Sequence, residues 1–291
     1  MESGLNLAKE VGADLMLATD PDADRVGIAM KCPDGSYELV SGNEVGVLLL
    51  DYICAGRIEK GTMPENPVAV KSIVSTPLAD AVAAHYGVEL RNVLTGFKWI
   101  GDQIAQLEEA GEVDCFIFGF EESYGCLPGT YARDKDAPAA VCMLCEVAAF
   151  YKSQGKTLWD GMIDMYEKYG YYREGIATMT LKGIDGAAQI QQIMDRARQS
   201  TPAKLGAFDV LAVRDYKADT RKDLKTGEVT ATGLPSSNVL YYELSDNAWC
   251  CVRPSGTEPK IKFYVGVKGD TLDGADQMLE ELKAEVLKHF E

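Results

Sequence analysis

Three aspartates on alternate positions of one short loop are the strongest chemical signal in this sequence. The loop follows an apolar strand predicted over 13–18 and reads Asp20-Pro-Asp22-Ala-Asp24-Arg25. Carboxylates spaced in this way can converge on one hard divalent cation, and a neighbouring arginine suits a phosphate that bridges to the metal. We therefore expect a metal site whose ligands are Asp20, Asp22 and Asp24.

Two other interpretations of this loop stay open. It can be a solvated acidic turn, or Asp20 can be the nucleophile of a metal-dependent phosphatase. The third aspartate and Arg25 make the phosphatase less attractive. An EF-hand is excluded, because Arg25 and Lys31 stand where that motif requires glycine and glutamate.

A second loop combines a glycine with a lysine between a predicted strand and a predicted helix. It reads Thr95-Gly-Phe-Lys98. Backbone amides at a helix start, together with the charge of Lys98, can hold a sugar phosphate. A structural helix start with an incidental lysine explains the same residues equally well.

A third loop offers two carboxylates and a hydroxyl directly after an apolar strand. It reads Glu121-Glu122-Ser123-Tyr-Gly125, and Lys135 downstream adds positive charge. Such groups can bind adjacent hydroxyls of a sugar. Paired glutamates also occur in glycoside hydrolases, but neighbours in one loop hardly flank a scissile bond from opposite sides.

A fourth loop lies between two predicted strands near the C-terminal end of the sequence. It begins Arg253-Pro-Ser255-Gly256-Thr257. Two hydroxyls, a glycine that permits close backbone approach and the fork of an arginine make a cradle for a phosphate dianion. A plain β-turn is the alternative interpretation.

The elements that must position these loops fall into two groups. Strands alternate with helices up to about residue 170, which is typical of parallel βαβ units, whereas strands dominate beyond it and indicate an α+β domain. Asn43 is the expected N-cap of a helix over 44–57, and 216–237 reads as a polar, mobile loop. The other expected strands are 26–30, 37–40, 68–74, 88–93, 114–118, 174–182, 209–215, 239–244, 248–252 and 261–267; the other helices are 4–12, 78–86, 99–109, 137–152, 158–169, 184–199 and 273–290.

The composition limits the partners that this chain can have. Its 291 residues carry 29 Lys and Arg against 45 Asp and Glu, a net charge of −16, which repels nucleic acids and anionic membranes. A small ligand is favoured, and an anionic one needs a local cluster of basic side chains. Without a signal peptide or an apolar run long enough to span a membrane, the chain is predicted to be cytoplasmic.

Cysteine and histidine contribute little to the predicted chemistry. Eight cysteines in a chain of this length are expected as reduced thiols, and Cys142 and Cys145, on a predicted helix, are expected to pack into the protein core rather than to bind a metal. The two histidines, His85 and His289, lie on helical patterns far from any nucleophile, so that a Ser/His/Asp triad is not expected.

Taken in order, the four loops resemble the α-D-phosphohexomutase family, in its phosphoglucomutase/phosphomannomutase branch. The resemblance implies α/β/α mixed-sheet domains followed by a C-terminal α+β domain. It further implies the end of domain 2 over 1–41, domain 3 over 42–170 and domain 4 over 171–291. The opening of the sequence, which reads as a helix running straight into a strand, fits a chain that starts inside an α/β unit.

The resemblance also implies a role for each loop. Asp20, Asp22 and Asp24 would hold Mg²⁺, with Arg25 beside the transferring phosphate. The residues that would seat the sugar phosphate are Glu121 and Ser123 at the hydroxyls, Thr95, Lys98 and Lys135 around the substrate, and Arg253, Ser255, Gly256 and Thr257 at its non-reacting phosphate. The implied substrates are glucose or mannose 1- and 6-phosphates and their bisphosphate.

In this family a phosphoserine in domain 1 donates its phosphoryl group to the sugar and later recovers the other one. No such serine loop occurs in the 291 residues, so the resemblance implies a chain that is inactive alone. A non-catalytic sugar-phosphate or metal-binding module and a phosphatase that uses Asp20 remain the alternative functions.

Overall fold

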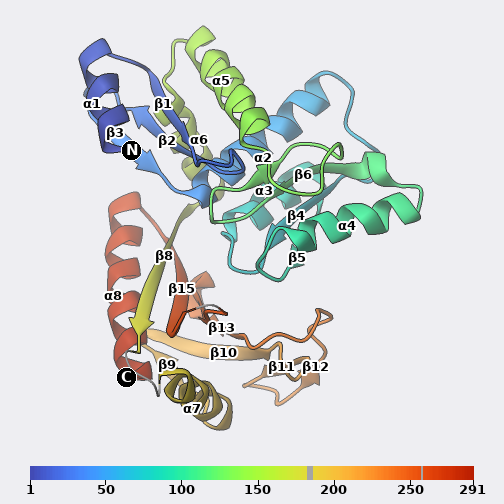
Figure 1. The fold of residues 1–291 in the computed structure, drawn as a ribbon, viewed down its shortest axis with the longest axis vertical. Helices are drawn as coiled ribbons and strands as arrows, with labels where there is room; N and C mark the ends of the chain where they lie inside the picture. Colours follow the sequence, from blue (N-terminus) through green and yellow to red (C-terminus); the bar gives the residue numbers. More distant parts are fainter. Residues whose placement is uncertain (182–185, 257) are drawn as a thin grey trace. The chain divides into compact units, whose positions relative to one another are not determined.

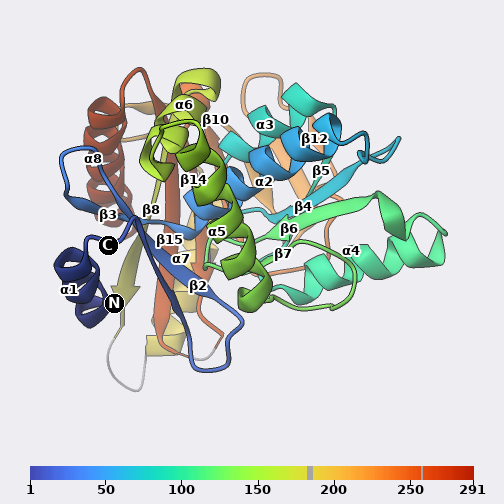
Figure 2. The same ribbon diagram turned by 90° about the horizontal axis from the view of Figure 1, so that it is seen from above.

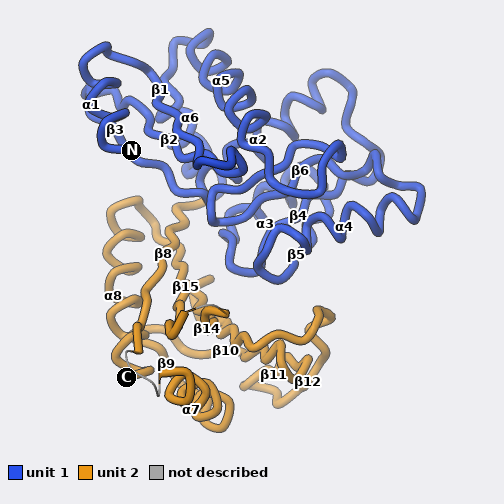
Figure 3. The backbone as a smooth tube through the Cα atoms, viewed as in Figure 1, with its two compact units in different colours: residues 1–169 blue, residues 170–291 orange. Residues whose placement is uncertain are grey.

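The computed structural model describes residues 1–181, 186–256 and 258–291. They form two compact units, residues 1–169 and residues 170–291 (Figure 3). In the described part of the chain, no helix combines the length and the apolar character that a membrane crossing requires.

The first unit begins with a small antiparallel sheet that carries the aspartate loop. Its strand order is β1 (Leu15–Thr19), β2 (Val26–Lys31), β3 (Tyr37–Val40), and α1 (Glu2–Val11) precedes it (Figure 1). The aspartates thus lie in the connection of a β-hairpin. The second hairpin turns at Gly35, whose positive φ of 86° suits a residue without a side chain.

A four-stranded sheet carries the second and third loops. Its order is β5 (Glu89–Val93), β4 (Val68–Ser72), β6 (Phe116–Phe120), β7 (Cys126–Leu127), and only β7 runs antiparallel to its neighbour. The parallel pairs confirm the predicted βαβ units. Because Val113–Cys115 form a short 3₁₀ turn, β6 begins at residue 116 and not at the predicted residue 114. Glu121 therefore follows the end of the strand directly.

Helices cover both faces of this sheet, with α2 (Gly42–Glu59) and α3 (Leu78–Tyr86) on one side and α4 (Lys98–Glu109) on the other (Figures 1 and 2). Ile100, Ile104 and Leu107 of α4 pack into the apolar core formed with β4 and β6. Two more helices, α5 (Ala137–Ser153) and α6 (Leu158–Tyr169), complete the unit.

The start of α2 differs from the prediction. Ser41, not Asn43, is the N-cap: its side chain accepts the N–H of Glu44, and the Glu44 carboxylate accepts the N–H of Ser41. The side chain of Asn43 instead accepts the N–H of Thr76 at 3.0 Å, which joins α2 to the turn after β4.

The second unit is an antiparallel sheet backed by α7 (Gly186–Gln199) and α8 (Leu272–Phe290). Apolar side chains of both helices and of the central strands form its core. The strand order is β12 (Val229–Thr230), β11 (Thr220–Asp223), β10 (Phe208–Asp215), β13 (Leu240–Leu244), β14 (Trp249–Pro254), β15 (Lys260–Gly269), β8 (Tyr171–Thr180), and β9 (Lys204–Leu205) pairs with β10.

Two further expectations are wrong. The segment 216–237 is no open loop: it contains β11 and β12, which extend the sheet as a ribbon, and the Asp219 carboxylate ties its ends by accepting the N–H groups of Thr232 and Gly233. Cys142 and Cys145 are exposed rather than in the core. Because α5 is apolar on most of its surface, the sequence did not reveal which of its faces is buried.

The capping box of α2 leads to a stability prediction. Ser41→Ala removes the side-chain acceptor and should lower the free energy of unfolding by about 1 kcal/mol. Urea unfolding followed by circular dichroism measures this difference. Ser153→Ala, at the exposed end of α5, should change stability little, and an equal loss in both variants would contradict the role given to Ser41.

Candidate functional site

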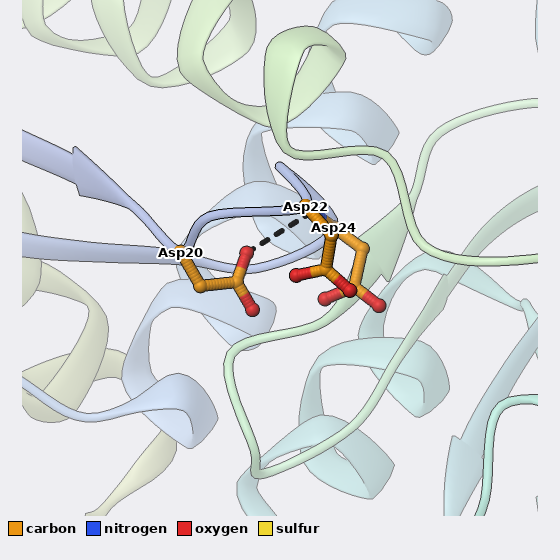
Figure 4. Close-up of side chains that lie close together, drawn as sticks. All are labelled: Asp20, Asp22 and Asp24. Carbon is orange, nitrogen blue, oxygen red and sulfur yellow. Dashed lines mark hydrogen bonds between the residues drawn. The ribbon is translucent and has the colours of Figure 1, made fainter.

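The three aspartates converge as their spacing predicted. One carboxylate oxygen of each lies within 4.8 Å of the others (Figure 4). The loop folds around Asp20, whose Oδ1 accepts the N–H groups of Asp24 and Arg25, each at 3.1 Å. These hydrogen bonds, foremost the one from Arg25, lower the pKa of Asp20 and keep its carboxylate charged.

Asp24 Oδ1 gives a test of whether a metal fits here. This oxygen is buried and has no hydrogen-bond partner among the described residues, and the Nε of Arg25 lies 3.9 Å away. A buried carboxylate oxygen without a partner is costly, and a cation would satisfy it. An all-oxygen donor set suits a hard divalent cation, so the residues present fit the Mg²⁺ that the resemblance implied.

Lys135 connects the aspartate loop to the two other loops of this unit. Its Nζ lies 2.9 Å from Asp24 Oδ2 and 2.8 Å from Asp134 Oδ1, and 5.5 Å from the centre of the Phe97 ring. Its aliphatic stem crosses Gly125, where a Cβ atom would come within 2.3 Å of the lysine Cδ. Burial lowers the pKa of Lys135, but its bonds to Asp134 and Asp24 outweigh this and raise it overall.

Glu121 joins the third loop to the second. It is 6% exposed, and its Oε1 accepts the N–H of Gly96 at 2.6 Å. Burial, and secondly the charge of Glu122, raises the pKa of Glu121 to about 7. The loop closes with a hydrogen bond from the N–H of Glu121 to Gly125 O at 2.9 Å.

Backbone contacts also hold the aspartate loop, residues 20–25, against the third loop, residues 121–125, which we call the glutamate loop. Arg25 forms a β-bridge with Gly125, and the N–H of Val26 donates to Tyr124 O at 3.3 Å. The N–H of Ala137, at the start of α5, donates to Ala23 O at 3.2 Å. The structure therefore brings together the aspartates, Arg25, Glu121, Lys135 and the backbone of the Thr95–Lys98 loop.

The remaining predicted residues of this unit lie near the same loops with fewer contacts. Lys98 is the exposed first residue of α4, and its Nζ lies 4.9 Å from the centre of the Trp99 ring. Thr95 and Ser123 are half-buried.

The fourth loop connects β14 and β15 of the second unit. The N–H of Ser255 donates to Lys260 O at 2.8 Å, and Ser255 Oγ accepts the N–H of Glu258 at 3.3 Å. Gly256 is exposed, and Thr257 lies outside the described residues. Arg253 stands opposite Lys262 across the two strands, a pairing of like charges that an anion would relieve.

Comparisons with known proteins give similarity to one group of enzymes. Residues 41–169 match the family described as "Phosphoglucomutase/phosphomannomutase, alpha/beta/alpha domain III". Over 280 residues the chain is 36% identical to a phosphoglucomutase of Staphylococcus epidermidis, covering 96% of this chain and 50% of that protein. The chain is thus similar to the phosphoglucomutases and phosphomannomutases. It spans about half the length of the curated relatives that it matches.

Solved phosphohexomutase structures share the fold. The open form of parafusin, a phosphoglucomutase of Paramecium, superposes with a TM-score of 0.65 at 17% identity, over 99% of this chain and 49% of that one. The N-acetylphosphoglucosamine mutase of Aspergillus fumigatus, in complex with GlcNAc-6P and magnesium, has a TM-score of 0.52 at 12% identity, over 99% and 53% of the two chains. At these identities, the likeness concerns the fold of the phosphohexomutases.

The structure adds polar residues that the sequence did not indicate. At the end of β4, the side chains of Lys71, Ser72 and Ser75 are buried, and Ser72 Oγ donates to Glu122 Oε2 at 2.8 Å. The available signal was the change from apolar to polar residues at the carboxyl end of a parallel strand, where α/β folds place their sites.

The aspartate loop generates a metal-binding prediction. Asp24→Asn removes a charged oxygen at nearly constant shape and should weaken Mn²⁺ binding to this chain by roughly tenfold or more. Electron paramagnetic resonance of free Mn²⁺ measures the affinity. Asp34→Asn, in the exposed turn before β3, is the matched control, and equal affinities in both variants would remove Asp24 from the site.

The buried carboxyl of Glu121 generates a pH prediction. Its folded-state pKa of about 7 lies above the ordinary 4.5, so the stability linked to the protonated form is complete below 4.5 and disappears as the pH rises through 7. Glu121→Gln should therefore be as stable as the parent chain at low pH and more stable at pH 8, by up to about 3 kcal/mol.

Urea unfolding of both proteins across this range tests the sign. Glu112→Gln, which changes an exposed glutamate after α4, should show no such trend. A Glu121→Gln advantage that is the same at every pH would contradict the raised pKa.

Proposed function

We propose that the protein to which this chain belongs is a phosphoglucomutase/phosphomannomutase. It would move a phosphoryl group between C1 and C6 of a hexose phosphate through a phosphoserine and a bisphosphate intermediate. The observation that carries the proposal is the convergence on Lys135: its ammonium group contacts Asp24 and the ring of Phe97, and its aliphatic stem passes closely over Gly125 of the glutamate loop. Metal, phosphate and sugar recognition then meet around a single side chain.

We assign the transfer chemistry to the first loop. Asp20, Asp22 and Asp24 would hold Mg²⁺, and Arg25 would lie beside the transferring phosphate. The bound ion would supply charge neutralisation of the phosphoryl group. Arg25 and Lys135 would add fixed positive charge at the same place, in a site where Asp24 Oδ1 otherwise stays without a hydrogen bond.

We assign sugar recognition to the second and third loops. Glu121 and Ser123 would bind the ring hydroxyls, and Thr95, Lys98 and Lys135 would seat the substrate. The buried carboxyl of Glu121, anchored on the N–H of Gly96, is well suited to a fixed orientation. The expected substrates are the 1- and 6-phosphates of glucose or mannose.

The second unit would grip the phosphate that does not react. Arg253, Ser255, Gly256 and Thr257 are the proposed residues, and the facing pair Arg253 and Lys262 supports an anion there. A cradle that reads only phosphate serves either end of the sugar, as the turnover of the bisphosphate requires. In family terms, residues 1–41 would end domain 2, 42–170 would be domain 3, and 171–291 would be domain 4.

Activity assays test this proposal. The full-length protein should interconvert glucose 1-phosphate and glucose 6-phosphate, and Asp24→Ala should lower kcat/KM by at least about a hundredfold because it removes a metal ligand. The chain of 291 residues alone should give no turnover, since we propose that the phosphoserine belongs to sequence outside it. A coupled dehydrogenase assay for glucose 6-phosphate measures both.

The alternatives give different outcomes. Release of inorganic phosphate from sugar phosphates by the chain alone would favour a phosphatase in which Asp20 is the nucleophile. Binding of sugar phosphate by the full-length protein without any interconversion would favour a non-catalytic module. Either result would overturn the mutase proposal.

A further inference from the structure

A pair of buried hydroxyls lies beneath the glutamate loop, outside every motif used so far. Ser72 ends β4, and Ser75 lies in the turn before α3; they are 0% and 1% exposed. Ser72 Oγ lies 2.8 Å from Glu122 Oε2 and 2.9 Å from Ser75 Oγ. Side chains of three segments are thus linked in one chain of hydrogen bonds.

The chemistry of the groups fixes the direction of this chain. A carboxylate only accepts, so the single hydroxyl proton of Ser72 goes to Glu122. Ser72 Oγ can then only accept from Ser75, whose proton is the one left between the two oxygens. The order Ser75 to Ser72 to Glu122 is the only one that satisfies both contacts, and the charged acceptor strengthens it.

The far end of the chain is held rigidly. The N–H of Ser75 donates to Ser72 O at 3.0 Å, and the buried Lys71 Nζ donates to Ser75 O at 3.2 Å. The next residue, Thr76, is tied to α2 by the side chain of Asn43. Ser75 is therefore held in a fixed position by β4 directly and by α2 through Thr76.

The near end holds one side of the glutamate loop. Glu121 is anchored on Gly96 of the β5–α4 turn, whereas Glu122 is anchored on Ser72 at the end of β4. The carboxylates of two neighbouring residues are thus hydrogen-bonded to two different segments of the unit. Ser123 is the next residue in the chain. The backbone of Glu122 also lies close to Gly42, where a Cβ atom would come within 2.2 Å of Glu122 O.

We propose that Ser72 and Ser75 are positioning residues that act through Glu122. They would fix the orientation of Glu121 and Ser123 toward the sugar hydroxyls, and so set the discrimination between hexose phosphates that differ at one ring hydroxyl. This inference rests on the proposed function for its substrate. Its structural part, the tethering of the loop, stands independently.

Kinetics of the full-length enzyme test the effect on specificity. Ser72→Ala should raise KM and lower kcat/KM for the preferred substrate by about tenfold, the effect of losing a hydrogen bond to a charged group. The preference between glucose 1-phosphate and mannose 1-phosphate should narrow. Ser153→Ala is the matched control, and an equal loss of kcat for both sugars at unchanged KM would overturn the positioning role.

A double-mutant cycle tests the route through Glu122. Ser72→Ala combined with Glu122→Ala should be no worse than either change alone, because each breaks the same link. Glu122→Gln keeps an acceptor oxygen and should retain most of the preference. Fully additive losses in the double variant would overturn the inference.

Amide hydrogen exchange on the 291-residue chain separates this inference from the proposed function. Ser72→Ala should speed exchange at the N–H of Glu121 and of Val26, which close the loop through Gly125 and Tyr124. Unchanged rates at both amides would overturn the tethering even in an active enzyme. If the full-length protein has no mutase activity, the proposed function fails, and faster exchange still supports the tether.

Discussion

The ammonium group of Lys135 is the interaction on which this site depends. Its side chain is 9% exposed, and a charge so buried is tolerable only beside the carboxylates that it meets, Asp24 and Asp134. The same position requires a glycine at 125 for the lysine stem to pass. The ion pair between Lys135 and Asp24 thus joins the hairpin loop of the first sheet to the residues beside β7 of the second sheet. It does so in a chain whose net charge is strongly negative.

Much of the fold could be predicted because hydrophobic periodicity reports burial. The parallel strands β4 and β5 and the helices α3, α4 and α6 were expected within a few residues of their observed bounds. Periodicity failed where burial does not alternate. Cys142 and Cys145 lie on a helix that is apolar nearly all round, and β11 and β12 form a ribbon that is exposed or half-buried along its length, so neither pattern revealed its structure.

The site was predictable to the extent that its residues are consecutive. Asp20, Asp22 and Asp24 are recognisable from their spacing, because one short loop contains all three. Ser72 and Ser75 do not, since two serines after an apolar strand look like any turn, and their meaning comes from a carboxylate 50 positions away in the chain. The N-cap of α2 shows the same limit: Ser41 and Asn43 are both good caps in sequence, and only the tertiary partner of Asn43 decides between them.

Two glycines that pack closely at the glutamate loop limit how this loop can be exchanged between relatives. Gly42 leaves room for the backbone of Glu122, and Gly125 leaves room for Lys135, so both glycines must be kept whichever residues stand at 121–124. The part that can be exchanged is residues 121–124, whose side chains accept hydrogen bonds from Ser72 and from the N–H of Gly96. A loop transferred from a relative must therefore keep a hydrogen-bond acceptor for Ser72 at position 122. Without that acceptor the new loop would have the same surroundings but no side-chain hydrogen bond to β4 to fix its orientation.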